Sequence, residues 1–243
     1  MTTVRLASNT TNLERVALAS TNKLSQKPSL LVSHYYIKNF DRFRNELQFA
    51  DWAMDSGAFS AKNAGAEIRL DDYISACQER LESDPSLVEV FSLDVIGDHK
   101  ASYKNWQAMM MAGLPAIPTF HIGSPWSALT ALKGAPKIAL GGMVRRHPNH
   151  KLEWCRECFA RVWPKRLHGF GVMSPSLLRS VPFHSVDATN WQMGSKYGKW
   201  RAFPGITTKR GPSKNLTVEV EWCLSLEREL KGRWHKEMKL LED

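Results

Sequence analysis

Short apolar runs alternate with longer amphipathic stretches along most of the chain. The runs predict strands at 30–36, 52–54, 88–93, 115–120, 137–140, 167–172 and 183–186, with an eighth candidate near 200–203. The amphipathic stretches predict helices at 70–82, 100–112, 125–132, 150–162 and 175–181, and a long terminal helix at 216–241. This alternation predicts parallel strands joined by helical crossovers.

The number of strand–helix units favours an α/β fold of the (β/α)8 type, the TIM barrel. The alternative is a doubly wound open sheet, which usually has a Gly-rich turn after its first strand. Here the first predicted strand leads into Ile37-Lys38-Asn39-Phe40 instead. No linker is visible, so residues 1–243 are expected to form a single domain, with 1–26 as an N-terminal arm or cap and 215–243 as a C-terminal helix.

The charge balance is basic, with a formal net charge of +9 over 243 residues. Such a balance favours a polyanionic partner such as nucleic acid, although it also serves solubility alone. Two of the four cysteines, Cys155 and Cys158, form a C-x-x-C pair without the second pair that a zinc site needs, so no metal is expected. Because there is no apolar run of membrane-spanning length and no signal peptide, we expect a cytoplasmic protein without a membrane partner.

Polar residues and glycines recur where the predicted strands end. They are Asp55, Asp94, His121, Gly141, Gly142, His168, Gly169, Gly171 and Asp187. A single Asp after a strand is usually a helix N-cap, but in a barrel the carboxyl ends of all strands meet at one mouth. The absence of a strand-end Lys argues against Schiff-base chemistry, and paired carboxylates suit reactions at an anomeric carbon.

The order of these strand-end motifs resembles that of the tRNA-guanine transglycosylase (queuine tRNA-ribosyltransferase) superfamily. The matching pieces are Asp55-Ser56-Gly57-Ala58-Phe59, Ser92-Leu93-Asp94, Leu140-Gly141-Gly142-Met143, Gly169-Phe170-Gly171 and Ser185-Val186-Asp187. They span residues 51 to about 190, which is most of the chain.

The resemblance implies a role for each matched residue. Asp187 would be the nucleophile that attacks the sugar and expels guanine, and Asp55 would be the general acid and base. Asp94 would accept hydrogen bonds from the guanine edge. The other base-binding residues that it implies are Ser56, Phe59, His121, Gly141, Gly142, Met143 and His168.

The chain also departs from the tRNA enzymes of this superfamily. It lacks their C-x-C-x-x-C…His zinc subdomain, since only Cys223 and His235 follow Asp187, and it is markedly shorter. These differences make it more similar to the phage-encoded DNA transglycosylases. The resemblance then implies DNA rather than tRNA as partner, in a host cytoplasm if phage-encoded. It also implies a 7-deazaguanine such as 7-cyano-7-deazaguanine as co-substrate, no other cofactor, and a homodimer as in many relatives.

A basic stretch interleaved with aromatic residues follows Asp187. Phosphate neutralisation and base stacking would suit a strand whose target base leaves the stack, although a solvated loop with core tryptophans fits as well. The nucleic-acid-binding candidates are Arg145, Arg146, Lys196, Lys199, Trp200, Arg201, Lys209 and Arg210.

Three alternatives to DNA base exchange remain open at this point. The first is the same exchange on tRNA, and the second is an N-glycoside hydrolase that releases guanine to water. The third is a nucleic-acid-binding module without catalysis, against which the presence of all three aspartates argues.

Overall fold

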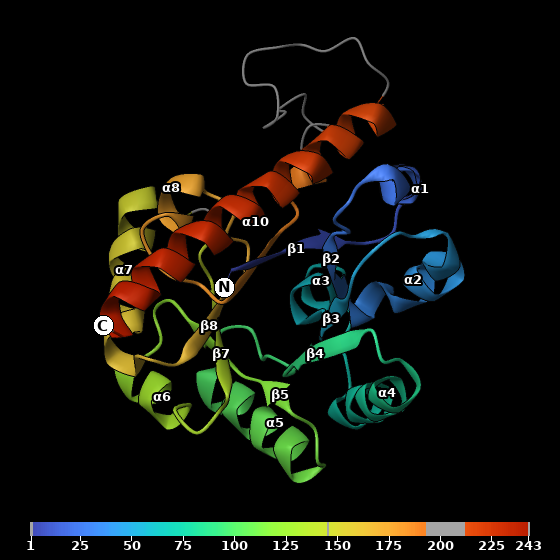
Figure 1. Cartoon of the computed structure of the whole chain (residues 1–243). Helices are drawn as coiled ribbons and strands as arrows, with labels where there is room; N and C mark the ends of the chain where they lie inside the picture. The colour runs from blue at the N-terminus through green and yellow to red at the C-terminus, as the bar shows by residue number, and fades with distance from the viewer. Residues whose placement is uncertain (1, 145, 193–211, 243) are drawn as a thin grey trace.

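The protein folds into a nearly closed barrel of parallel strands alternating with helices (Figure 1). The computed structural model describes residues 2–144, 146–192 and 212–242. The strands are β1 (Thr3–Ser8), β2 (Ser29–Ser33), β3 (Trp52–Asp55), β4 (Leu87–Phe91), β5 (Ala116–Ile117), β6 (Thr119–His121), β7 (Lys137–Gly141), β8 (Arg166–Gly169) and β9 (Ser185–Ala188). They pair in the order β5-β4-β3-β2-β1-β9-β8-β7-β6, which confirms the predicted TIM-barrel architecture.

Helices surround the barrel. The α-helices are α1 (Asn12–Ala19), α2 (Ile37–Phe43), α3 (Ala58–Asn63), α4 (Leu70–Ser83), α5 (His99–Met111), α6 (Trp126–Ala131), α7 (Pro148–Val162), α8 (Pro175–Leu178) and α10 (Pro212–Glu242). The short 3-10 helices are η1 (Ser20–Lys23), η2 (His34–Tyr36), η3 (Arg44–Glu46) and η4 (Asn190–Gln192). Among the described residues, no helix is long and apolar enough to cross a membrane.

Pro118 divides one barrel strand into β5 and β6. Proline has no N–H to donate to a ladder, so regular pairing stops at this residue. The backbone still bridges the break, because Ser92 N donates to Ile117 O at 2.9 Å on one side and Ala139 N donates to Pro118 O at 2.8 Å on the other. With β5 and β6 taken as one strand, the described residues form eight barrel strands, as in a TIM barrel.

The N-terminal segment is part of the barrel. Residues 1–26 were expected to form an arm or cap, but β1 pairs in parallel with both β2 and β9. The strand was missed because its inward-facing Arg5 interrupts the apolar pattern; the guanidinium is buried and pairs with Asp51 and Glu89. The strand expected near 200–203 lies outside the described residues.

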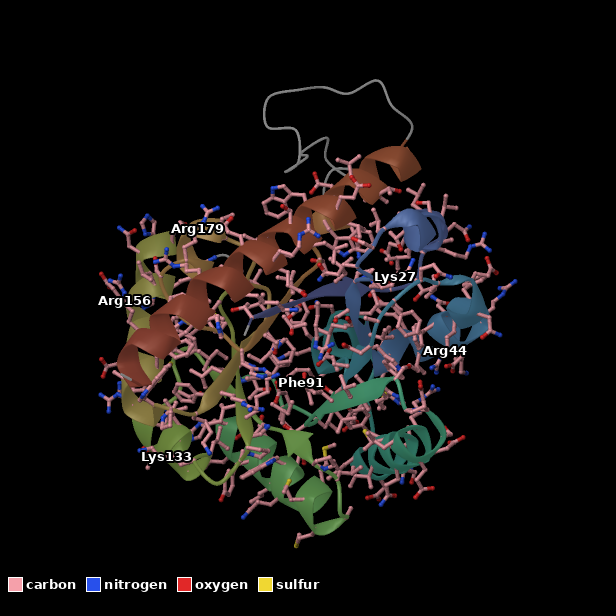
Figure 2. The ribbon with its side chains drawn as sticks, viewed as in Figure 1. Lys27, Arg44, Phe91, Lys133, Arg156 and Arg179 are labelled. Atoms are coloured by element: carbon pink, nitrogen blue, oxygen red, sulfur yellow. The ribbon has the colours of Figure 1, made fainter. Side chains whose placement is uncertain are left out.

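The barrel interior is layered. One interior layer is formed by side chains from different strands, with Phe170 packed against it. Its members are Ala7, Leu31, Ala53, Phe91, Ile117 and Ala139. Figure 2 shows Phe91 near the middle of the molecule, whereas Lys133, Arg156 and Arg179 lie near its outline. Toward the N-terminal ends of the strands lies a buried ion cluster, in which Glu89 joins Arg5 at 3.2 Å and Lys137 at 2.5 Å. The ion cluster and the layer around Phe91 occupy the N-terminal end and the middle of the barrel interior. The C-terminal ends of the strands are therefore the place for a site.

The terminal helix α10 joins the two ends of the chain. It runs across one side of the barrel and contacts α1, β1 and η4 (Figure 1). The buried carboxylate of Glu227 on α10 accepts a hydrogen bond from Val4 N at 2.8 Å and pairs with Lys231 at 2.5 Å. The helix predicted at 216–241 is therefore present, and it packs against the first barrel strand.

Candidate active site

Three aspartates meet at the C-terminal mouth of the barrel. Asp55 ends β3, Asp94 follows β4, and Asp187 lies in β9. They are within electrostatic reach of one another, since Asp94 raises the pKa of Asp55 and Asp55 raises the pKa of Asp187. The expectation that these strand ends converge holds for the three carboxyl groups.

Asp55 is held by the tight turn that follows β3. Gly57 N donates to Asp55 Oδ2 at 3.2 Å, and Gly57 has a φ of 81°. A Cβ at this position would lie 2.4 Å from Ser33 Oγ, so the turn requires glycine. Burial and the nearby charge of Asp94 raise the pKa of Asp55 to about 6.

Asp94 faces His121 across the mouth. The distance from His121 Nε2 to Asp94 Oδ2 is 3.4 Å. Burial raises the pKa of Asp94 to about 7 and lowers the pKa of His121, so the histidine is neutral when the aspartate ionises. Asp94 Oδ1 is buried, and the Thr119 hydroxyl near this carboxyl group opposes the rise of its pKa.

Gly141 makes room for the His121 ring. A Cβ on Gly141 would lie 2.8 Å from His121 Cδ2 and 3.0 Å from Thr119 Cγ2. Real Cβ atoms do not approach other atoms this closely, so a larger residue would displace the imidazole that faces Asp94. The glycine acts here on a neighbouring side chain, whereas the resemblance gave it a contact with a base.

Asp187 belongs to a buried hydrogen-bonded chain. Its Oδ1 atom lies 3.2 Å from His168 Nε2 and accepts from Gly171 N at 3.2 Å, and His168 Nδ1 lies 2.8 Å from Ser185 Oγ. The rings of Phe91 and Phe170 each lie 4.7 Å from the His168 ring, centroid to centroid. The imidazole is therefore fixed by packing as well as by its two hydrogen bonds.

The protonation states of this chain follow from its burial. Burial raises the pKa of Asp187 to about 8, although the Gly171 N–H opposes the shift. Burial also lowers the pKa of His168 well below its usual range, and the charges of Lys137 and Arg5 add to this effect. At neutral pH the imidazole is neutral and Asp187 mostly carries its proton.

The mouth thus holds both acids and a base near neutrality. With pKa values of about 6, 7 and 8, Asp55 is mostly ionised, Asp94 is divided between its two forms, and Asp187 is mostly protonated. Carboxyl groups whose environments separate their pKa values in this way are suited to act as general base and general acid on one substrate.

The other base-binding candidates lie in different surroundings. Phe59 on α3 is 64% exposed. The buried Ser56 hydroxyl accepts from Ala58 N at 3.4 Å, and the exposed Gly142 lies in a turn with a φ of 77°. Met143 is buried between the barrel and α7, with its sulfur 3.6 Å from the Cys155 sulfur. Met143 therefore packs in the outer core.

The nucleic-acid-binding candidates fall largely outside the described residues. This is true of Arg145, Lys196, Lys199, Trp200, Arg201, Lys209 and Arg210. Arg146 is described and exposed. Cys155 and Cys158 are buried thiols with pKa values raised by burial, and no group of three metal-ligating side chains occurs in the part of the chain that the structure describes.

Sequence reasoning missed several residues that shape the mouth. Ser185 and Phe91 were assigned no role, although both contact His168. Ser185 lies two residues before Asp187, and the period of two along a strand places both side chains inside the barrel. That signal was available for Ser185, but its meeting with His168 depends on the pairing of β8 with β9.

Comparison with known proteins gives the fold and no family. No protein-family model matches the chain, and no curated protein matches its sequence. The chain is similar in structure to a putative fructose-1,6-biphosphate aldolase from Coccidioides immitis (TM-score 0.56, 9% identity, covering 93% of this chain and 89% of that one). It is likewise similar to the YdjI aldolase from Escherichia coli K12 (TM-score 0.55, 9% identity, covering 93% of this chain and 91% of that one). A third similar structure is the tryptophan synthase alpha chain from Legionella pneumophila (TM-score 0.53, 10% identity, covering 95% of this chain and 90% of that one). At such identities these structures show a shared TIM-barrel fold alone.

These findings correct the expected function. The prediction of a guanine transglycosylase is wrong, on DNA as on tRNA, because the similar structures are aldolases and tryptophan synthase subunits and no family model supports the resemblance. The physical reason is that aspartates and glycines at strand ends serve many barrel mouths. A nucleophilic Asp187 would have to be ionised, whereas burial keeps its proton bound at neutral pH. The expected nucleic-acid partner, 7-deazaguanine base and homodimer are not tested by the described residues.

Proposed function

We propose that this protein is an enzyme that uses carboxyl groups for general acid–base catalysis on a small polar substrate, in an aldol-type cleavage without a lysine Schiff base. The observation that carries the proposal is the set of three aspartates at the barrel mouth, Asp187 buried and Asp55 and Asp94 half-buried, with pKa values of about 6 for Asp55, 7 for Asp94 and 8 for Asp187. Separated pKa values let one group accept a proton while another gives one.

Each aspartate has a distinct part in this reaction. Asp55, the group most ionised at neutral pH, removes the proton of a β-hydroxyl group on a carbonyl substrate. The carbon–carbon bond then breaks, the alcohol carbon becomes a carbonyl group, and the bonding electrons pass into the enolate of the other product. Asp187, which holds a proton near neutrality, gives it to that enolate, and Asp94, which faces His121 across the mouth, accepts a hydrogen bond from the substrate.

His168 is a positioning residue in this scheme. A neutral imidazole donates through one ring nitrogen and accepts through the other. When Asp187 is ionised, Nε2–H donates to it and Nδ1 accepts from Ser185; when Asp187 is protonated, it can donate to Nε2 while Nδ1–H donates to Ser185. The contacts at 3.2 Å and 2.8 Å permit both states, so His168 holds the carboxyl group in place as its proton leaves and returns.

The lysines of the described residues do not favour an imine mechanism. Lys137 is the buried lysine among them, and it lies at the N-terminal end of β7, paired with Glu89 at 2.5 Å. A Schiff-base lysine must reach the substrate at the opposite end of the barrel. The similar structures, aldolases among them, supply only the reaction class to test first.

The test is turnover of a panel of β-hydroxy ketones and β-hydroxy acids in deuterated water, followed by proton NMR. We expect cleavage with deuterium incorporated into the enolate-derived product. Asp55→Asn and Asp187→Asn should each lower the rate by about a hundredfold or more, because each removes one proton-transfer group. The matched control is Asp98→Asn, since Asp98 is exposed and caps α5, a role that Asn also fills.

Two results would contradict the proposal. One is unchanged turnover in both site variants. The other is inactivation by sodium borohydride only in the presence of substrate, which would show a lysine imine instead.

A further inference from the structure

A groove lies outside the barrel, between α5 and α6. Its volume is about 450 Å³, within the range of small-molecule sites. It opens here because α6 covers only Trp126–Ala131, whereas α5 runs from His99 to Met111. The groove is separate from the aspartates of the mouth, none of which lines it.

The floor of the groove is apolar. Pro118 and Phe120 contribute from the barrel strand, and Ala128, Ala131 and Leu132 contribute from α6 and its end. The Phe120 ring is buried and packs against Trp126 and Trp154, with centroids 5.7 and 5.6 Å away. The floor is thus a firm surface on which an apolar body gains free energy by leaving water.

One wall of the groove carries positive charge. Lys100 and Lys104 lie one turn apart on α5, beside His99, and no acidic residue lines the groove. Among the described residues, none of these three side chains forms an ion pair. The nearby Asp98 carboxylate accepts from the backbone N–H groups of Lys100 and Ala101. Like charges one turn apart repel, so an anion between them would be stabilised.

Neutral hydrogen-bonding groups complete the lining. Tyr103 and Gln107 lie on the α5 side and contact each other at 3.4 Å, and Ser124 and Ser127 lie on the opposite side. The side chains of Lys100 and Lys104 line the groove together with the apolar floor.

We propose that this groove binds a small organic anion with an aromatic or alkyl body, its acidic group toward Lys100 and Lys104 and its body on the floor formed by Pro118, Phe120 and α6. The charge of the wall and the apolar floor together define this class of ligand. A nucleic-acid backbone would use the lysines but would leave the apolar floor empty.

The probe for the test is 8-anilinonaphthalene-1-sulfonate, an aromatic sulfonate whose fluorescence rises in apolar surroundings. Titration of the full chain should show saturable binding of one probe. Amide NMR signals should shift in α5, β6 and α6. The uncharged N-phenyl-1-naphthylamine, which has the same rings without the sulfonate, should bind more weakly.

Three variants separate the contributions. Replacing both lysines, as Lys100→Gln with Lys104→Gln, should weaken binding of the sulfonate about fivefold, as expected for exposed charge pairs. Ala128→Phe should fill the groove and abolish binding, with circular dichroism as the check on folding. The control Lys38→Gln removes one positive charge, from exposed Lys38 on α2, and should change nothing.

The proposal is overturned if Lys38→Gln weakens binding as much as the double variant, or if the uncharged compound binds as tightly as the sulfonate. It is also overturned if the double variant loses affinity for a single-stranded oligonucleotide but not for the sulfonate, which would make this wall a nucleic-acid contact. Lys100 and Lys104 are exposed, so their substitution should leave the fold intact. The test with the lysine variants therefore stands even if Ala128→Phe fails to fold.

Discussion

Asp187 shows how burial alone can change the role of a residue. Its position in β9 and its motif suggested an ionised nucleophile, but it is 6% exposed and surrounded by His168, Gly171 and the barrel interior. An aspartate usually titrates near pH 4, whereas burial raises the pKa of this one to about 8. The same residue therefore serves as an acid in the mechanism proposed above.

This pKa also affects stability. Between pH 4 and pH 8, approximately, the folded chain keeps a proton that the unfolded chain has released, so the free energy of unfolding falls as the pH rises through this window. Asp187→Asn keeps the shape of the protonated group and should make the protein more stable by ~2 kcal/mol or more near pH 8, with little change near pH 4. Urea unfolding across this range measures the effect.

The control for that experiment is Asp72→Asn on α4. The Asp72 side chain is exposed, and its Oδ2 atom lies 3.7 Å from Arg69 Nε. It removes the same charge and should leave the pH dependence unchanged. If Asp187→Asn has the pH profile of this control, the carboxyl group is ionised in the folded protein.

At the scale of elements, two of the strands that the sequence predicted well have short, mainly apolar runs. Residues 52–54 and 137–140 were predicted as strands and lie within β3 and β7. β1 was missed because its inward-facing Arg5 interrupts the apolar pattern. A barrel strand can carry such a charged side chain where acidic residues pair with it, as Asp51 and Glu89 do with Arg5. Those partners come from other strands, so no local pattern announces them.

The same distinction applies to the candidate site. The convergence of Asp55, Asp94 and Asp187 follows from a rule about parallel strands and needs no coordinates. The contact of Ser185 and Asp187 with His168 depends on the register between β8 and β9, and local sequence does not encode it. Motif order misled the functional inference because it cannot distinguish barrels that share strand-end aspartates and glycines.

The ion cluster predicts a large effect of one substitution in β1. Arg5→Ala would remove a buried guanidinium and leave Asp51 and the half-buried Glu89 with fewer cationic partners inside the barrel. Removing one member of a buried ion pair costs about 3–5 kcal/mol. Chemical denaturation should show a loss of this size for Arg5→Ala.

Arg15→Ala is the matched control, because Arg15 pairs with Glu46 at 2.9 Å on the surface. Its expected cost is below about 1 kcal/mol. Equal costs for the two variants would mean that β1 is not held by its interior charges.

At the scale of the molecule, the paired ions that connect strands lie at one end of the barrel, and the candidate catalytic carboxyl groups lie at the other. The N-terminal ends of the strands hold paired ions such as Lys137 and Glu89, and the C-terminal ends hold carboxyl groups that lack cationic partners among the described residues. The interior layer around Phe91 lies between them. The charges that pair strands with one another are therefore separate from the carboxyl groups of the mouth.

The measurement that tests this account most directly is a carbon-13 NMR titration of the aspartate carboxyl groups, with signals assigned through Asp55→Asn, Asp94→Asn and Asp187→Asn. We predict three coupled titrations spread from about pH 6 to about pH 8, with the signal lost in Asp187→Asn titrating last. Three independent titrations near pH 4, the value of an ordinary aspartate, would contradict the acid–base site.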